Sequence, residues 1–143
     1  MRYRISTDQI ILHCSATPEG RQITVDQVKE WHLHRGWHDI GYHYVIDLDG
    51  VVHEGRDIHK QGAHCRGQNY NSIGICYIGG LSREMEPKDT MTQEQMSGLY
   101  QITHQLRAIF GGLPIFGHNE FSEKACPSFD VIEKFGAFCK RTI

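Results

Sequence analysis

The sequence predicts a mixed α/β fold, a central mixed β-sheet flanked by helices, in a single domain over residues 1–143. Two observations lead to this class. Apolar runs of strand length alternate along the chain with segments of helical periodicity. The 143 residues match the size of one domain, contain no internal repeat or linker, and are 39% hydrophobic and 22% charged, as in ordinary globular proteins.

The first elements are predicted to be a buried strand and a helix. Gln9–Cys14 is a short apolar run of strand length. Thr24, with Gln27 three residues later, is a capping-box pattern that predicts the start of a helix, which we expect to end near Gly36. Apolar residues recur on one face of this helix: Val25, Val28 and Trp31.

A hairpin and a further strand follow. Residues 42–48 and 51–54 are predicted to be two strands joined by a turn at Asp49-Gly50, because Asp-Gly is a strong hairpin signal. Residues 72–78 are rich in β-branched side chains and end at a pair of glycines, which predicts another strand.

The second half of the chain is predicted to hold two helices and a short strand. Thr92 with Gln95 forms a second capping-box pattern, and a wide apolar stripe follows it. The stripe consists of Met96, Leu99, Tyr100, Thr103, Leu106 and Phe110. Residues 113–116 predict a short final strand, and Ser128 is expected to cap a C-terminal helix. The apolar residues of that helix are Val131, Ile132, Phe135 and Phe138.

Charge and hydropathy argue against two kinds of partner. A net charge of −2 and a pI of about 6.5 provide no basic face for nucleic acid, so we expect no nucleic-acid partner. No apolar stretch approaches the roughly 20 residues that span a bilayer, and the N-terminus lacks the apolar core of a signal peptide. We therefore expect a chain that is cytoplasmic when synthesised and does not insert into a membrane.

Cysteine and histidine usage favours a metal site over a disulfide framework. The five cysteines are an odd number without Cys-x-x-Cys spacing, and a cytoplasmic chain keeps its thiols reduced. Ten histidines raise the expectation of a metal site, since imidazole is the commonest metal ligand. Four cysteines are expected to be small apolar fillers: Cys14, Cys65, Cys76 and Cys139.

His13 interrupts the apolar strand Gln9–Cys14. Side chains alternate across a sheet, so His13 shares a face with Ile11, whereas Leu12 lies on the other face. A histidine near the carboxyl end of such a strand either lines a site or is a hydrogen-bonded core residue. Taken alone, the strand pattern favours the hydrogen-bonded core residue.

His118 and Cys126 bracket a loop between a short strand and a helix, a common position for functional residues. Together they can close on one zinc ion with a third ligand from elsewhere in the chain. Three protein ligands leave a fourth tetrahedral position for water, which is the arrangement of catalytic zinc. From spacing alone, a packed cysteine and an exposed histidine fit the loop equally well.

Several separate motifs occur in the order found in one family of enzymes. They are His13-Cys14-Ser15-Ala16-Thr17, Trp31-His32, Gly36-Trp37, Gly41-Tyr42-His43-Tyr44, Asp49-Gly50, Gly55-Arg56-Asp57, Gly62-Ala63-His64, Asn71-Ser72-Ile73-Gly74 and Lys124-Ala125-Cys126-Pro127-Ser128-Phe129-Asp130. In these motifs the chain resembles the bacteriophage lysozymes that are N-acetylmuramoyl-L-alanine amidases, relatives of the animal peptidoglycan recognition proteins. The resemblance is specific because it rests on the whole ordered set, which extends over most of the chain.

The resemblance implies a zinc enzyme of the endolysin type. His13, His118 and Cys126 are implied to bind Zn²⁺, with a catalytic role for Tyr42 and an auxiliary one for Lys124. The implied reaction cleaves peptidoglycan, by zinc-activated water, at the amide bond between the lactyl group of N-acetylmuramic acid and L-alanine of the stem peptide. The residues implied to line the substrate groove are His64, Asn69 and Trp37.

The resemblance also bears on location and partners. A peptidoglycan hydrolase made without a signal peptide acts on the bacterial cell wall after release or after export by another route. Some phage lysozymes of this type also bind and inhibit an RNA polymerase, and no residue of this sequence indicates whether this chain does.

Two other functions stay open on the sequence. A cysteine hydrolase would use Cys126 as nucleophile and His118 as base, but it leaves His13 without a role. A non-catalytic peptidoglycan-binding module can dispense with the cysteine and the tyrosine, and this chain has both. Glu120 is disfavoured as a protease-like general base because it lies in no His-Glu-x-x-His helix. His43 is expected to be a buried, hydrogen-bonded histidine rather than a ligand.

Overall fold

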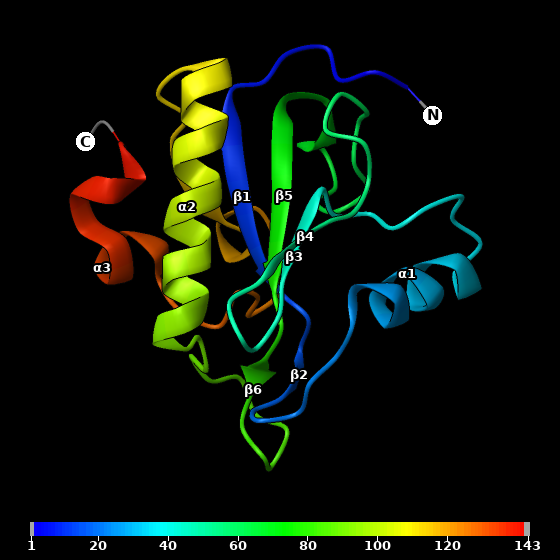
Figure 1. Ribbon diagram of the computed structural model, residues 1–143, viewed down its shortest axis with the longest axis vertical. Helices are drawn as coiled ribbons and strands as arrows, with labels where there is room; N and C mark the ends of the chain where they lie inside the picture. The colour runs from blue at the N-terminus through cyan, green and yellow to red at the C-terminus, as the bar shows by residue number, and fades with distance from the viewer. Residues whose placement is uncertain (1, 142–143) are drawn as a thin grey trace.

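The computed structural model describes residues 2–141 of the chain (Figure 1). Its β-strands are β1 (Gln9–Cys14), β2 (Thr17–Pro18), β3 (Tyr44–Ile46), β4 (Val52–Glu54), β5 (Ser72–Tyr77), β6 (Gly80–Leu81) and β7 (Ile115–Gly117). Its α-helices are α1 (Val25–His34), α2 (Gln93–Phe110) and α3 (Val131–Phe135). Its 3-10 helices are η1 (Asn69–Asn71), η2 (His118–Glu120) and η3 (Gly136–Cys139).

Five strands form the main sheet in the order β4-β3-β5-β1-β7. β1 pairs in parallel with both β5 and β7, β3 pairs in parallel with β5, and β4 runs antiparallel to β3. The predicted class, a central mixed sheet with flanking helices, is therefore confirmed. All six residues of β1 are buried, as expected for a parallel strand between two neighbours and covered on both faces.

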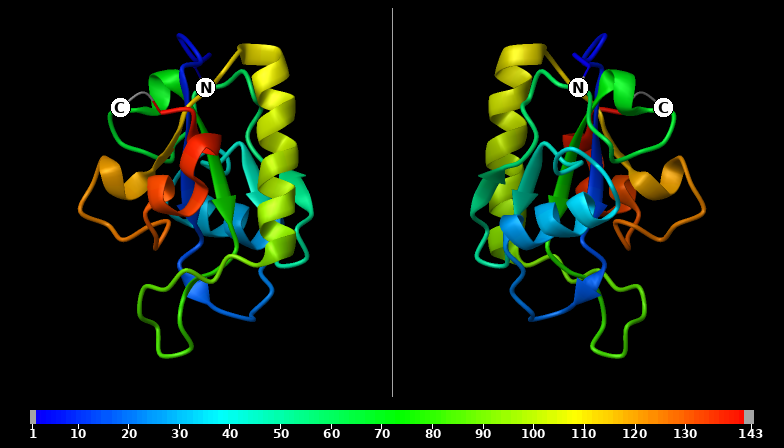
Figure 2. Two further views of the ribbon diagram at one scale, coloured as in Figure 1. Left: turned by 90° about the vertical axis from the view of Figure 1, so that its left-hand side faces the viewer. Right: turned by 90° about the vertical axis from the view of Figure 1, so that its right-hand side faces the viewer.

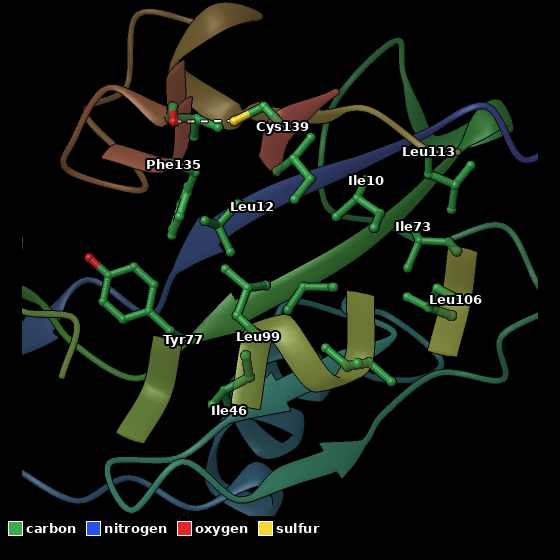
Figure 3. Close-up of a cluster of buried hydrophobic side chains, with 14 of the residues drawn as sticks. Ile10, Leu12, Ile46, Ile73, Tyr77, Leu99, Leu106, Leu113, Phe135 and Cys139 are labelled. Atoms are coloured by element: carbon green, nitrogen blue, oxygen red, sulfur yellow. Dashed lines mark hydrogen bonds between the residues drawn. The ribbon is translucent and has the colours of Figure 1, made fainter. Parts of the chain in front are cut away.

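One face of the sheet carries the main apolar core. Alternate residues of the strands, such as Ile10, Leu12 and Ile75, are fully buried there against α2, which lies beside β1 and β5. Leu99 and Leu106 project from α2 into this core, and α3 adds further apolar side chains (Figure 3). A smaller cluster on the other face joins α1 to the sheet: Ile23, Val28, Ile40, Val45, Cys76 and Ile78.

Both predicted capping boxes are present. The Thr24 side chain accepts from the Gln27 N–H at 3.1 Å, and the Gln27 side chain accepts from the Thr24 N–H at 2.8 Å. Thr92 and Gln95 make the same reciprocal pair at the start of α2. These local hydrogen bonds explain why the starts of both helices were readable from sequence.

Two expected details are wrong. Asp130, not Ser128, caps α3, since its carboxylate accepts from the Glu133 N–H, whereas the Ser128 hydroxyl donates to the Gly80 carbonyl at 2.8 Å. The hairpin is also shorter than predicted. The last pair, Ile46 with Val52, encloses a five-residue loop over residues 47–51 in place of a two-residue Asp-Gly turn.

A second, two-stranded sheet was not predicted. Thr17 of β2 pairs with Gly80 of β6, and in Figures 1 and 2 this small sheet lies beyond the carboxyl ends of β1 and β5. Such short strands exist only through pairing between segments far apart in the chain. Within residues 2–141, no helix combines the length and the apolar character needed to cross a membrane.

Candidate metal centre

Two adjacent parallel strands deliver the two predicted histidine ligands to one edge of the sheet. Leu12 of β1 is paired with Gly117, the last residue of β7. His13 follows Leu12 within β1, and His118 begins η2 directly after β7. Their ring centroids lie 4.6 Å apart. The carboxyl ends of parallel strands are the usual place for ligand sites in α/β proteins, because the following loops open there.

Cys126 completes the group from the loop that follows η2. Its sulfur lies 3.7 Å from His13 Nδ1, and the ligand atoms of His13, His118 and Cys126 all lie within 4.8 Å of one another. Tetrahedral zinc with ordinary Zn–N and Zn–S bond lengths separates a nitrogen ligand from a sulfur ligand by about 3.6 Å. The donor set and its spacing therefore fit a tetrahedral metal ion with one position left open.

The surroundings keep both imidazoles neutral. Burial lowers the pKa of His13 well below its ordinary value, and the nearby His64, His118 and Lys124 lower it further. Burial and Lys124 also lower the pKa of His118. A neutral imidazole has a free lone pair, which is the form that binds a metal.

The Cys126 environment does not suit a free nucleophile. A hydrogen bond with the Cys14 thiol and burial raise the pKa of the Cys126 thiol. A nucleophilic cysteine needs the opposite shift, whereas a bound cation supplies the charge that stabilises a thiolate. The Cys14 backbone N–H also donates to the Cys126 sulfur at 3.1 Å, which orients it toward His13.

Tyr42 stands beside the metal group at the entry to β3. Its ring centroid lies 5.1 Å from that of His13 and 5.3 Å from that of His32. Burial raises the pKa of Tyr42 well above its ordinary value. The phenol therefore stays protonated and can donate a hydrogen bond to a developing negative charge.

A groove of about 500 Å³ lies beside the metal group and is lined in part by His118. It is lined by all the residues expected to act on or bind a substrate beside the metal: Trp37, Tyr42, His64, Asn69 and Lys124. Lys124 belongs to the same loop as Cys126, and its positive charge lowers the pKa of both ligand histidines. The structure thus gathers these side chains at one groove, and their roles stay predictions.

The three expected substrate-binding residues differ in how they are held. The Trp37 ring packs on His32 with centroids 4.7 Å apart. Asn69 braces a loop, because its Oδ1 accepts from the N–H groups of His64 and Cys65 at 3.0 Å each. His64 is only 8% exposed and has both ring nitrogens within hydrogen-bond distance of protein atoms. Among the described residues, Trp37 is thus held by ring contacts with His32 and Arg35 rather than by side-chain hydrogen bonds.

Two residues that also line the groove, His32 and Arg35, were not predicted to have a role there. His32 Nδ1 accepts the Gly41 N–H at 2.8 Å, which leaves Nε2 as the protonated atom. Burial, with Arg35 and Arg56 nearby, lowers the pKa of His32 to about 4. The Trp31-His32 motif was the available signal, but helical spacing alone does not show that His32 turns toward a groove.

Glu120 and His43 are both held by hydrogen bonds to groups outside the metal site. The Glu120 carboxylate is held by the Gly117 N–H and by Arg141, both at 2.7 Å, which argues against a general-base role. His43 is buried and hydrogen-bonded as predicted, since it accepts the Gly74 N–H at 3.0 Å and lies 2.8 Å from the Lys60 carbonyl. The four cysteines expected to fill space are all buried: Cys14, Cys65, Cys76 and Cys139.

Sequence comparisons identify the family of the chain. Residues 3–129 match the family described as N-acetylmuramoyl-L-alanine amidase. The endolysin of Escherichia phage T7 is 41% identical over 130 residues, which cover 91% of this chain and 86% of that protein. The endolysin of Enterobacteria phage K11 is 40% identical over 128 residues, which cover 90% of this chain and 85% of that protein.

Solved structures show the same fold. The endolysin N-acetylmuramoyl-L-alanine amidase LysCS from Clostridium intestinale superposes with a TM-score of 0.83 at 24% identity, covering 99% of this chain and 88% of that one. Drosophila PGRP-LB superposes with a TM-score of 0.78 at 24% identity, covering 99% of this chain and 86% of that one.

Proposed function

The chain belongs to the N-acetylmuramoyl-L-alanine amidase family, and from this premise we propose that it is a zinc-dependent peptidoglycan hydrolase. The bond cleaved is the amide between the lactyl group of N-acetylmuramic acid and L-alanine of the stem peptide. The observation that carries the proposal is the convergence of His13, His118 and Cys126, with ligand atoms within 4.8 Å, beside a groove that His118 lines.

His13, His118 and Cys126 would hold the zinc ion through two neutral nitrogens and one sulfur. When bound there, Zn²⁺ supplies a Lewis acid that polarises a carbonyl group and lowers the pKa of a coordinated water. Because only one ligand is anionic, the site keeps a net positive charge. The chain would thus provide an electrophilic centre beside the groove for an otherwise unreactive amide.

Tyr42 and Lys124 act on the charge that develops during cleavage. Attack on the amide carbonyl produces an oxyanion, and a protonated phenol next to the metal group donates to it. The Lys124 ammonium lines the same groove and adds a positive charge. Both groups stabilise the transition state more than the uncharged substrate, so both raise the rate of the chemical step.

The groove is suited to a glycan joined to a peptide. Its lining combines the aromatic Trp37 with polar groups, among them Asn69, and such mixed surfaces bind sugar rings and peptide amides. At about 500 Å³ it has the volume of a small-molecule site. We propose peptidoglycan as the partner bound there.

The test is product analysis of purified peptidoglycan. The protein is used with zinc, after treatment with a zinc chelator, and after zinc is restored. We expect new N-terminal L-alanine with zinc, its loss on chelation and its return on restoration. Cys126→Ser should release none, whereas Cys139→Ser, the same change at a buried thiol that donates to the Val131 carbonyl, should stay active.

Three outcomes would overturn this proposal. Cleavage that is insensitive to chelation but lost in Cys126→Ser would indicate the cysteine hydrolase. Binding of peptidoglycan without cleavage in any metal state would indicate a recognition module. Fragments without new N-terminal L-alanine would place the cleaved bond elsewhere.

A further inference from the structure

A series of three linked hydrogen bonds holds the His13 ring on the side away from the metal group. His13 Nε2 lies 2.8 Å from His64 Nδ1, and His64 Nε2 lies 3.2 Å from the Ser72 hydroxyl. The Ser72 hydroxyl in turn lies 2.6 Å from the Gln68 carbonyl oxygen. His13, His64 and Ser72 are 1%, 8% and 0% exposed, so water does not compete strongly for these contacts.

The Gln68 carbonyl, at the end of this series, fixes the direction of every hydrogen bond in it. A carbonyl only accepts, so the single Ser72 hydroxyl proton points to Gln68. Ser72 can then only accept from His64, which places the His64 proton on Nε2. A neutral imidazole carries one proton, so His64 Nδ1 accepts from His13 Nε2–H.

The consequence falls on the other His13 nitrogen. With its proton on Nε2, His13 presents an unprotonated Nδ1, the atom that lies 3.7 Å from the Cys126 sulfur. If the direction of every hydrogen bond in this series were reversed, His13 Nδ1 would carry a proton and its lone pair would be blocked. This reversal would also leave the Gln68 carbonyl without its hydrogen bond from Ser72, which costs free energy.

Gly74 of β5 provides the space that the His64 ring occupies. Gly74 follows Ser72 on the same face of β5, and a Cβ there would lie 2.5 Å from the His64 ring. A side chain at position 74 would therefore displace the imidazole from its place between His13 and Ser72. The loop that carries His64 is further held by the Asn69 side chain, which accepts from two of its N–H groups.

We propose that Ser72 and His64 are positioning residues that fix His13 in the Nε2–H tautomer, so that Nδ1 is the ligand atom. His64 thereby acts through His13 rather than as a primary contact for substrate. The purpose of the arrangement rests on the proposed function, but the tautomer itself is a property of the protein with or without metal or activity.

The direct test is the protonation of the two rings in the full chain. Protein labelled with ¹⁵N-histidine is kept in a zinc chelator, and long-range ¹H–¹⁵N NMR correlations identify which nitrogen of each ring carries hydrogen. We expect His13 and His64 both to be protonated at Nε2. A His13 ring protonated at Nδ1 would overturn the proposal, even if the protein is an active amidase.

A pair of variants tests the effect on metal affinity. His64→Asn keeps an acceptor oxygen near the position of Nδ1, whereas His64→Leu removes it. Zinc affinity, measured by competition with a chromophoric chelator, should fall about 10–100-fold in His64→Leu, the usual effect of losing such a partner. His64→Asn should recover most of this loss.

The outcomes separate this inference from the proposed function. Equal affinity in the Asn and Leu variants would overturn the positioning role, provided that both unfold cooperatively in chelator. If the unmodified protein binds no zinc, the proposed function fails, and the NMR result still decides the tautomer. Amidase activity with unchanged zinc affinity in His64→Leu would retain the function and reject the positioning role.

Discussion

The two faces of the main sheet do different work, and β1 and β5 show the division residue by residue. On one face Leu12 and Ile73 are fully buried in the apolar core with Leu99 of α2 (Figure 3). On the other face His13 lies opposite Cys76 of β5, and Ser72 and Gly74 support the His64 ring. The first face holds large apolar groups, and the second holds small residues that make space for imidazoles.

Stability and chemistry depend on different faces of this sheet. The apolar face gains free energy from burial and close packing. The histidine face buries polar rings, and each needs a hydrogen-bond partner to avoid a desolvation penalty. At neutral pH we therefore expect substitutions on the apolar face to act on unfolding, and substitutions around the metal group on the histidine face to act on metal binding and catalysis.

The largest effect on the apolar side is expected for Leu99→Ala. Leu99 is fully buried, and removal of a buried leucine side chain costs about 2–5 kcal/mol of unfolding free energy. Urea unfolding measures the loss, with Ile109→Ala, an exposed residue of the same helix, as the control. A zinc affinity of the folded Leu99→Ala protein that fell as steeply as its stability would contradict the separate roles of the two faces.

On the histidine side, Tyr42→Phe should lower kcat by about 100- to 1,000-fold, as for the loss of one donor to an oxyanion. Its unfolding free energy should change little, because the phenol ring is retained. Rates of L-alanine release measure the effect. Tyr44→Phe is the matched control, since Tyr44 packs against the apolar core. Equal losses of activity in both variants would contradict the division between the faces.

Acidification should destabilise the histidine face through His43. Burial lowers the pKa of His43 from 6.5 to about 4, so the unfolded chain binds a proton that the folded chain does not. This contribution to stability is complete above pH 6.5 and is lost as the pH falls toward 4, by about 3 kcal/mol for this shift.

Urea unfolding between pH 7 and pH 4, in chelator, tests the His43 prediction. His43→Asn retains an acceptor for the Gly74 N–H, and its stability should fall less steeply with acid than that of the parent protein. His104→Asn, at an exposed position of α2, should retain the parent pH dependence. Parallel curves for the parent and His43→Asn would remove His43 as the cause.

The smallest effect is expected on the surface, outside both faces. Lys88 and Glu19 form an ion pair at 2.9 Å, with side chains that are 50% and 32% exposed. Solvent screening limits such pairs, so Glu19→Gln should cost less than about 1 kcal/mol of unfolding free energy. Thermal unfolding at low and high salt measures it. A loss comparable to that of Leu99→Ala would show that the sheet faces do not dominate stability.

Local signals explain which parts of the fold were predictable. β1 and the starts of α1 and α2 were found because an apolar run or a capping box lies within a few residues. The α3 cap was misassigned because two candidates, Ser128 and Asp130, lie two residues apart. Only the tertiary contact of Ser128 with Gly80 decides between them.

The site shows the same limit. The sequence supplied His13, His118 and Cys126 through a family resemblance, but their spacing in the chain did not show that they converge. The link from His13 through His64 to Ser72 joins segments more than 50 residues apart, since the pair His13 and His64 alone is separated by 51. Such contacts depend on the parallel pairing of β1 with β5, which no local pattern specifies.

The most direct test of the proposed metal centre is X-ray absorption at the zinc edge of the zinc-loaded protein. Two nitrogen ligands at about 2.0–2.1 Å and one sulfur at about 2.3 Å are expected. Cys126→Ser should lose the sulfur signal, and Cys139→Ser should keep it. A zinc environment without sulfur in the parent protein, or one unchanged in Cys126→Ser, would contradict the metal centre assigned to His13, His118 and Cys126.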